Sequence, residues 1–295
     1  MPAPLRILLD FYHPWSHHAP LFAARAQGFW AGLGQEVEIA CGDPFRGDAL
    51  AYLERGEVDF GLSYPNRLMA RVAEGADLVA VCALTDRPLE SITWREERGF
   101  TRPRDLEGQR VGYRKSARMT ALLNHLVEKD GGDPQRVNHV VMYPAEPMPS
   151  DLESGEIDAM FGALWAWEGL HGPVMHGLRL AHAEVHEWGA PRYNAQVLVA
   201  RRATAERFGF AVVDGWRKGV TWVQNHEPAA LELMEEAAPY FAPALLMASL
   251  ETMMEVWGDG SFRRADLEVY HQWLLSVGLV ARPVDLDATF WEPRP

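Results

Sequence analysis

LERGEVD, from Leu53 to Asp59, and LESGEID, from Leu152 to Asp158, are two copies of one short pattern in this chain of 295 residues. Each copy leads at helical spacing into a glycine, then a glutamate, a β-branched residue, an aspartate and an apolar run. That order predicts a helix, a glycine stop and a buried strand. The simpler alternative is a favourable helix-to-strand turn with no wider meaning. Because the surroundings recur too, we interpret the copies as matching corners of two α/β lobes.

Strand and helix patterns alternate through the first two thirds of the chain, and the last third is helical. Buried-strand patterns fall at 5–11, 37–41, 58–62, 78–84, 108–113, 138–143, 157–164, 178–182 and 193–200. Helical patterns fall at 21–30, 49–55, 67–74, 120–130, around 152, and at 208–226, 228–240, 243–256 and 261–277. This alternation predicts mixed, mostly parallel sheets flanked by helices. We expect a first lobe from residues 1–90 and 195–295, with residues 91–194 inserted as a second lobe.

Composition excludes several classes of protein. A hydrophobic content of 48% suffices for packed cores, and a formal charge of −13 argues against nucleic acid as a partner. No apolar run approaches the roughly 20 residues of a membrane-spanning helix. Cys41 and Cys82 lack CxxC spacing and are expected to be small buried hydrophobes, which excludes cysteine-based metal sites. The first strand pattern begins at Leu5, so we expect a cytoplasmic protein starting at Met1, or a secreted form without its leader.

Five segments together resemble a known family. They are LLDFYHPWSHHAPLFAARAQGFW, LERGEVDFGL, DLEGQRVGY, LESGEIDAMFG and GSFRRADLEVYHQWLLSVGLV. In their order and spacing the chain resembles type 2 periplasmic binding proteins, in the group of formylaminopyrimidine-binding proteins and hydroxymethylpyrimidine phosphate synthases. The resemblance implies two lobes joined by two crossing strands and a small ligand held in the cleft between them. It also implies a solute-binding component of an ABC importer, with the importer's permease as a partner.

The positions that carry chemistry in the synthases differ here. Those enzymes have a lysine that holds pyridoxal phosphate and, four residues later, a histidine; the corresponding residues are Ser63 and Arg67. Their cysteine-rich CCCFC stretch is replaced by GAPRYNAQ, from Gly189 to Gln196. Without a Schiff-base amine the cofactor has no anchor. We therefore expect no cofactor, and binding rather than synthase activity.

Candidate ligand-binding residues cluster where the first lobe's strands end. Asp10 ends the first strand, and its carboxylate could accept hydrogen bonds from amino or ring N–H groups of a pyrimidine-like ligand; helix capping or an ion pair is the alternative. Tyr12, Trp15 and Tyr64 lie on loops at the same edge, where they could stack on a flat ring or simply pack between lobes.

The second lobe offers a matching set. Trp165 and Trp167 follow its repeated corner, so the two lobes could sandwich an aromatic ring. Glu168 could pair with a ligand amino group from the side opposite Asp10, or could be a solvated glutamate favoured by a helix N-terminus. The turn Arg114, Lys115 and Ser116 lies between a strand and a helix start, a geometry that receives an anionic group.

HPWSHH, from His13 to His18, has the composition of a metal tract. A metal site needs further ligands in fixed geometry, and neighbouring histidines in a turn are expected to point in different directions. We therefore expect no metal. His18 aligns with a histidine of the resembling group and is the histidine expected to face the ligand. The full set of expected ligand-binding residues is Asp10, Tyr12, Trp15, His18, Ser63, Tyr64, Tyr113, Ser116, Trp165, Trp167, Glu168 and Tyr193, with Asn194 as a secondary candidate.

Two functions fit the sequence. The first is a solute-binding protein that closes by hinge motion on an aromatic, amino-bearing metabolite such as a thiamine-type pyrimidine precursor. The second is a cytoplasmic enzyme on the same scaffold, such as a lyase, a decarboxylase or a pyrimidine synthase-like enzyme. The sequence offers no matched nucleophile and base, which favours binding.

Overall fold

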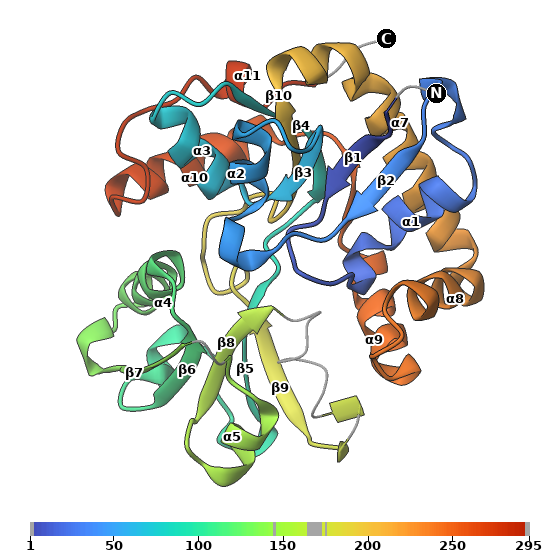
Figure 1. The fold of residues 1–295 in the computed structure, drawn as a ribbon. Helices are drawn as coiled ribbons and strands as arrows, with labels where there is room; N and C mark the ends of the chain where they lie inside the picture. The colour runs from blue at the N-terminus through green and yellow to red at the C-terminus, as the bar shows by residue number, and fades with distance from the viewer. Residues whose placement is uncertain (1–2, 144–145, 164–172, 175, 293–295) are drawn as a thin grey trace. The chain divides into compact units, whose positions relative to one another are not determined.

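The computed structural model describes residues 3–143, 146–163, 173–174 and 176–292 (Figure 1). The chain divides into two compact units. Unit 1 comprises Met1–Arg87 and Tyr193–Pro295, and unit 2 comprises Pro88–Arg192. Within the described ranges, no helix is both long enough and apolar enough to cross a membrane.

Unit 1 contains a six-stranded sheet in the order β11-β4-β10-β3-β1-β2. β1 pairs in parallel with β2 and β3, whereas β10 runs antiparallel between β3 and β4. The strands are β1 (Leu5–Leu8), β2 (Val37–Ala40), β3 (Phe60–Ser63), β4 (Leu78–Thr85), β10 (Val197–Arg201) and β11 (Trp257–Gly260). β10, which belongs to the second segment of unit 1, therefore lies inside the sheet between β4 and β3. Both segments of unit 1 are thus needed to form the sheet.

Helices cover both faces of this sheet. In Figure 1, α2, α3 and α10 lie on one side and α1 and α7 on the other. The helices of unit 1 are α1 (Ala19–Ala26), α2 (Ala49–Glu54), α3 (Pro65–Ala73), α7 (Arg202–Asn225), α8 (Glu227–Ala237), α9 (Pro243–Met254), α10 (Arg264–Ser276) and α11 (Leu286–Thr289). Glycine allows α7 to approach α1 closely, since a Cβ added to Gly219 would lie 2.1 Å from the carbonyl oxygen of Pro20.

Unit 2 contains a five-stranded sheet in the order β7-β6-β8-β5-β9. β6 is parallel to β7 and β8, whereas β5 is antiparallel to β8 and β9. The strands are β5 (Glu90–Arg95), β6 (Arg110–Arg114), β7 (Asn138–Met142), β8 (Ala159–Ala163) and β9 (Leu180–Glu184), and the helices include α4 (Ala117–Lys129) and α5 (Pro149–Ser154). Both units thus have the mixed α/β architecture that the sequence predicts.

The repeated heptapeptide forms the same corner in each unit. Its glycines, Gly56 and Gly155, have φ values of +72° and +73° and follow α2 and α5. Its aspartates then bind the neighbouring parallel strand. Asp59 accepts a hydrogen bond from the backbone N–H of Arg6 (2.8 Å), and Asp158 accepts one from that of Arg110 (2.9 Å). The motif is therefore a favourable helix-to-strand turn, and it occupies corresponding places in two similar sheets.

Some elements differ from the sequence prediction. The sequence does not predict β5 because four of its six residues are polar, although three of these, Glu90, Ser91 and Thr93, are buried. Glu90 forms an ion pair with Arg118, which offsets the cost of burying its charge. β11 is also not predicted. Cys41 is exposed rather than buried, because β2 lies at the edge of its sheet.

Candidate functional site

Asp10 is the centre of a buried hydrogen-bond cluster just beyond the end of β1. Its side chain is 3% exposed. Oδ1 accepts hydrogen bonds from Nε2 of His18 (2.8 Å) and Nε2 of His17 (3.3 Å). Oδ2 accepts one from Nε2 of Gln196 (2.8 Å), which directly precedes β10. The carboxylate therefore uses three of its roughly four acceptor positions within unit 1.

The adjacent histidines converge on Asp10, so the expectation that they point in different directions is wrong. They lie in a 3-10 turn, η1 (Ser16–His18), and their ring centroids are 3.7 Å apart. The turn is held by Ser16, whose hydroxyl donates to the carbonyl of Leu246 in α9 (2.9 Å). The tight turn, packed against α9, brings both rings to the same side.

The tautomer of His18 follows from its backbone contact. The N–H of Trp15 donates to Nδ1 of His18 (3.0 Å), so Nδ1 carries the lone pair and Nε2 carries the proton. Burial, together with the charge of His17, lowers the pKa of His18 to about 4 despite the opposing effect of Asp10. His18 is therefore neutral at pH 7 and donates its single N–H to Asp10.

Asp10 itself is ionised. Burial raises the pKa of its carboxyl, but the charge of His17 and the hydrogen bonds from His17 and His18 outweigh this effect, and the pKa lies well below its usual range. Among the described residues, no lysine or arginine forms an ion pair with Asp10. The end of β1 thus presents a buried negative charge with one acceptor position to spare.

The geometry argues against a metal ion at this cluster. Donor atoms of Asp10, His17 and His18 lie within 4.8 Å of one another, as a metal site would require. However, a metal on Nε2 of His18 needs a lone pair there, while the Trp15 N–H already requires the lone pair on Nδ1. A neutral imidazole cannot provide both. The cluster is therefore suited to holding a carboxylate rather than a metal.

Aromatic rings line the turn that follows Asp10. Tyr12 is 58% exposed and stacks on Phe11, with 4.6 Å between ring centroids. Trp15 is buried and stacks on Phe241 at 4.2 Å. The ligand-binding residues expected from the sequence do not include Phe241 or its exposed neighbour Tyr240. Both lie in the connection between α8 and α9, more than 220 residues along the chain from Trp15. The exposed ring of Tyr12 therefore lies close in sequence to the buried carboxylate of Asp10.

Ser63 and Tyr64 end β3 at the same sheet edge. Ser63 is buried and lies opposite Val197 in the β3–β10 pairing, directly beside the position of Gln196. Tyr64 is the N-cap residue of α3, and the guanidinium of Arg67 lies 5.1 Å from its ring centroid. The structure therefore places Ser63 on the strand next to β1 and Tyr64 directly after that strand.

Tyr193 and Asn194 occupy the return crossing. Tyr193 is 2% exposed and stacks on Tyr270 of α10, with ring centroids 4.0 Å apart. The amide of Asn194 donates to the carbonyl of Thr85 at the end of β4 (2.7 Å). Both side chains thus contribute to the packing of unit 1, and a ligand contact by either stays a prediction.

In unit 2, the described candidates are Tyr113 and Ser116. Tyr113 is fully buried in β6, and its hydroxyl bonds to Thr120 (3.0 Å) and His139 (2.8 Å). The hydroxyl of Ser116 caps α4 by accepting the N–H of Met119 (3.4 Å). Trp165, Trp167 and Glu168 lie outside the described residues.

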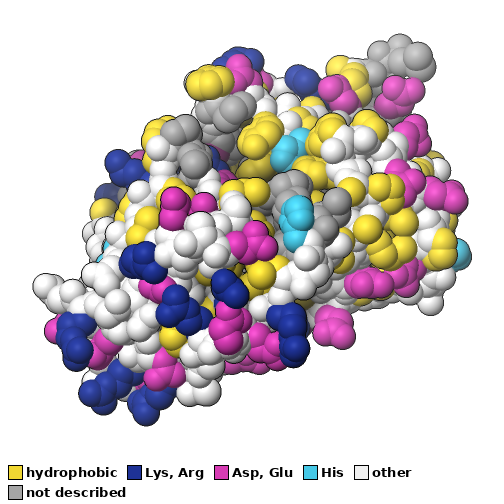
Figure 2. Space-filling view, turned by 90° about the horizontal axis from the view of Figure 1, so that it is seen from below, with side chains coloured by type: hydrophobic (Ala, Val, Ile, Leu, Met, Phe, Trp, Pro, Cys, Tyr) yellow, Lys and Arg dark blue, Asp and Glu magenta, His cyan; other side chains and the backbone are white. Residues whose placement is uncertain are grey.

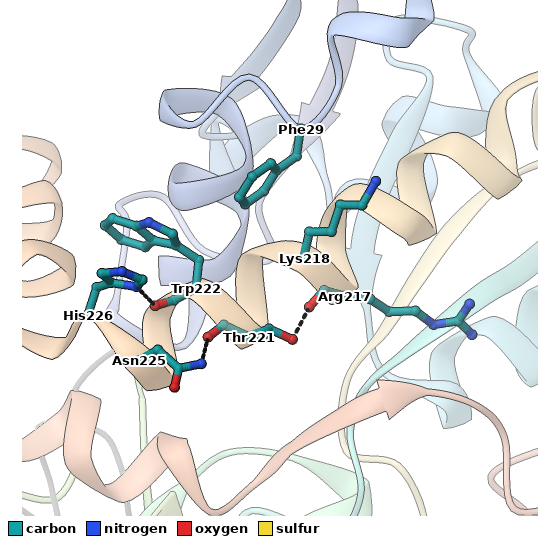
Figure 3. Close-up of a pocket in the computed structure, with 7 residues that line it drawn as sticks. All are labelled: Phe29, Arg217, Lys218, Thr221, Trp222, Asn225 and His226. Carbon is teal, nitrogen blue, oxygen red and sulfur yellow. Dashed lines mark hydrogen bonds between the residues drawn. The ribbon is translucent and has the colours of Figure 1, made fainter.

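Two surface features lie apart from these candidates. Acidic and basic side chains are intermixed on the face drawn in Figure 2, which offers no broad basic patch. A groove of about 440 Å³ follows α7 in unit 1 and is mainly apolar. Figure 3 shows its lining residues, Phe29, Arg217, Lys218, Thr221, Trp222, Asn225 and His226. None of the expected ligand-binding residues is among them.

Comparisons with known proteins identify similar sequences and structures. A family model described as NMT1/THI5 like matches residues 15–230. The formylaminopyrimidine-binding protein of Halalkalibacterium halodurans is 26% identical over 302 residues, covering 97% of this chain and 89% of that protein. The 4-amino-5-hydroxymethyl-2-methylpyrimidine phosphate synthase of Uromyces fabae is 31% identical over 111 residues, covering 37% of this chain and 32% of that enzyme.

The fold has a close structural counterpart. The periplasmic aliphatic sulphonate binding protein SsuA from Escherichia coli matches with a TM-score of 0.76 at 15% identity, covering 100% of this chain and 94% of that one. The expected fold class, a periplasmic binding protein fold with two mixed sheets flanked by helices, is therefore confirmed.

Proposed function

We propose that this chain, which belongs to the NMT1/THI5-like family, is the solute-binding component of an ABC importer. We propose further that its solute is a small aromatic metabolite with amino groups, similar to the pyrimidine precursors of thiamine. The name of the relative from Halalkalibacterium halodurans supports this ligand class. The likeness of the fold to a periplasmic binding protein supports the solute-binding role, not the ligand class.

The observation that carries the proposal is the buried, ionised carboxylate of Asp10. An ionised acceptor binds a charged or polarised N–H group about twice as strongly as a neutral acceptor does. His17, His18 and Gln196 fix its position before any ligand arrives, so little ordering is needed on binding. A ligand with an amino group could take the remaining acceptor position of Asp10, and Tyr12 offers a nearby face for its ring.

The proposed ligand contacts are the residues that the sequence predicts. Unit 1 would contribute Asp10, Tyr12, Trp15, His18, Ser63, Tyr64 and Tyr193, and unit 2 would contribute Tyr113, Ser116, Trp165, Trp167 and Glu168. A hinge at the two crossings near Ser91 and Tyr193 would allow the protein to close on the ligand. The ABC permease would then recognise the closed form.

An enzyme is the second candidate, and one observation favours it. The chain is 31% identical to a pyrimidine phosphate synthase over 111 residues. However, the resemblance places Ser63 where those enzymes have the cofactor-binding lysine, and a hydroxyl cannot form the imine linkage that anchors pyridoxal phosphate. Any chemistry on this scaffold would therefore have to use a different group.

Two exposed aromatic residues of unit 1 provide a matched test of the binding site. Tyr12→Ala should weaken binding of hydroxymethylpyrimidine or formylaminopyrimidine about ten-fold, because a stacking face is lost. Phe45→Ala removes a ring that is 98% exposed and lies outside the candidate set, so affinity should stay unchanged. Calorimetric titration of both variants checks this. Equal affinities in Tyr12→Ala and the wild type would remove the aromatic turn from the site.

A further inference from the structure

A second cavity in unit 1, of about 370 Å³, shares only Asn194 with the candidate residues described above. Its lining is mainly polar and consists of Asp86, Asn194, Trp257, Gly258, Asp259, Ser261 and Arg263. These residues come from the end of β4, the return crossing and the region of β11. The volume lies within the range of small-molecule sites.

Asp86 has unused hydrogen-bonding capacity in this cavity, and its side chain is 34% exposed. Its Oδ1 atom is buried and has no hydrogen-bond partner among the described residues. Its Oδ2 atom is held only loosely, 3.5 Å from Nη2 of Arg263. By contrast, the Oδ1 atom of Asp259 accepts hydrogen bonds from the backbone N–H and the hydroxyl of Ser261. Asp86 is thus a carboxylate with one empty and one weakly occupied oxygen.

A buried acceptor without a donor is costly, and a ligand that supplies the donor recovers that free energy. The geometry that suits a carboxylate best is a planar edge with two parallel N–H groups, as in an arginine fork. The cavity is lined by two carboxylates and one guanidinium, so its charge favours a cation. A metal ion suits it less well, because the guanidinium of Arg263 already lies beside the same carboxylate.

We propose that this cavity binds the two-pronged N–H edge of a flat cation, such as an amidinium or a protonated amino-heteroaromatic ring, with Asp86 as the acceptor. The inference rests on the proposed function, since an amino-bearing heteroaromatic solute has such an edge. Trp257 links this cavity to the Asp10 cluster, because it lines the cavity and its indole N–H donates to the carbonyl of His17 (3.2 Å).

Benzamidine is the probe for this cavity, because it carries the two-pronged edge without a pyrimidine ring. In a ¹H–¹⁵N spectrum, the indole signal of Trp257, assigned with Trp257→Phe, should shift saturably with a dissociation constant below about 1 mM. Asp86→Asn keeps the shape but turns one acceptor into a donor, so affinity should fall at least ten-fold. Asp214→Asn removes the same charge from α7, where Asp214 is partly exposed and pairs with Lys218, and should change nothing.

Arg263→Gln provides a test of opposite sign. It removes the cation that competes for Asp86, so benzamidine should bind equally or more tightly. A weaker complex would show that Arg263 itself holds the ligand and would overturn the proposal. Failure of benzamidine to bind the wild type, or equal binding by Asp86→Asn, would also overturn it.

The inference and the proposed function can fail separately. If pyrimidines bind and Asp86→Asn leaves both benzamidine and pyrimidine affinity unchanged, the solute-binding role stands and the cavity is not part of it. If benzamidine binds through Asp86 but no pyrimidine binds, the cavity is a cation site and the proposed solute class is wrong.

Discussion

Gln196 donates a hydrogen bond to Oδ2 of Asp10 at 2.8 Å, across 186 residues of sequence. The contact joins the end of the first strand to the residue that precedes β10, where the chain returns from unit 2. It therefore fixes the charge at the sheet edge and attaches the two halves of unit 1 to each other.

Gln196→Ala should destabilise unit 1 by about 1–3 kcal/mol, because a buried carboxylate loses one of its three donors. The unfolding midpoint in urea measures this loss. Gln224→Ala is the matched control, since Gln224 donates to a carbonyl from an exposed position on α7 and should cost much less. Equal losses of stability in the two variants would mean that the hydrogen bond to Asp10 contributes no more to stability than an exposed one.

Stability should fall on acidification below pH 6.5, because His18 is neutral in the folded protein. Its pKa is about 4 when folded and 6.5 in the unfolded chain, so the unfolded state binds more protons between these values. The contribution of His18 to the free energy of unfolding is complete above pH 6.5. It is lost as the pH falls towards 4, and the total loss is about 3 kcal/mol. Asp10, with its lowered pKa, adds to the loss only at still lower pH.

His18→Gln is the variant that isolates this effect. Its urea midpoint should be lower at pH 7, and it should depend less on pH between 6.5 and 4.5 than that of the wild type. His226→Gln, at an exposed position, should leave the slope as it is. An unchanged slope in His18→Gln would contradict the assignment of the neutral tautomer.

The repeated corner should respond to mutation locally in each unit. Asp59→Ala removes the acceptor for the Arg6 N–H and should speed amide exchange in β1 and β3. Asp158→Ala should do the same in β6 and β8, where Asp158 also binds the side chain of Arg110 (3.0 Å). Hydrogen exchange followed by mass spectrometry resolves the two units. Exchange that rises throughout the chain in either variant would argue against independent corners.

Gly219→Ala should prevent α7 from packing on α1, because its Cβ would overlap a backbone carbonyl that cannot move aside. We expect a loss of about 3 kcal/mol or more, or failure to fold, measured by thermal unfolding. Gly32→Ala, with nothing within 4 Å of its added Cβ, is the control. A stable Gly219→Ala protein would show that the two helices can separate without cost.

The sequence predicts the fold well where local patterns decide it. The repeated corner, the strand and helix alternation and the return of the chain to the first sheet all follow from apolar spacing and glycine stops. β5 escapes prediction because its buried polar residues are satisfied by distant partners such as Arg118, which no local pattern reveals.

The candidate site is predicted only in part. Asp10 and the aromatic turn are visible in the sequence because they follow a strand. Gln196, Phe241 and Asp86 are not, because their importance comes from contacts or cavities formed by residues far apart in the chain. The convergence of His17 and His18 is likewise a result of the 3-10 turn and its packing on α9.

The most direct test of the central claim is titration of the ligand-free protein with hydroxymethylpyrimidine, formylaminopyrimidine, thiamine, riboflavin and simple aromatic acids. Tryptophan fluorescence reports binding, and chromatography of each mixture reports any product. We predict saturable quenching by a pyrimidine at micromolar or lower concentration, with the ligand recovered unchanged. No binding across the panel, or the appearance of a product, would contradict the assignment as a solute-binding protein.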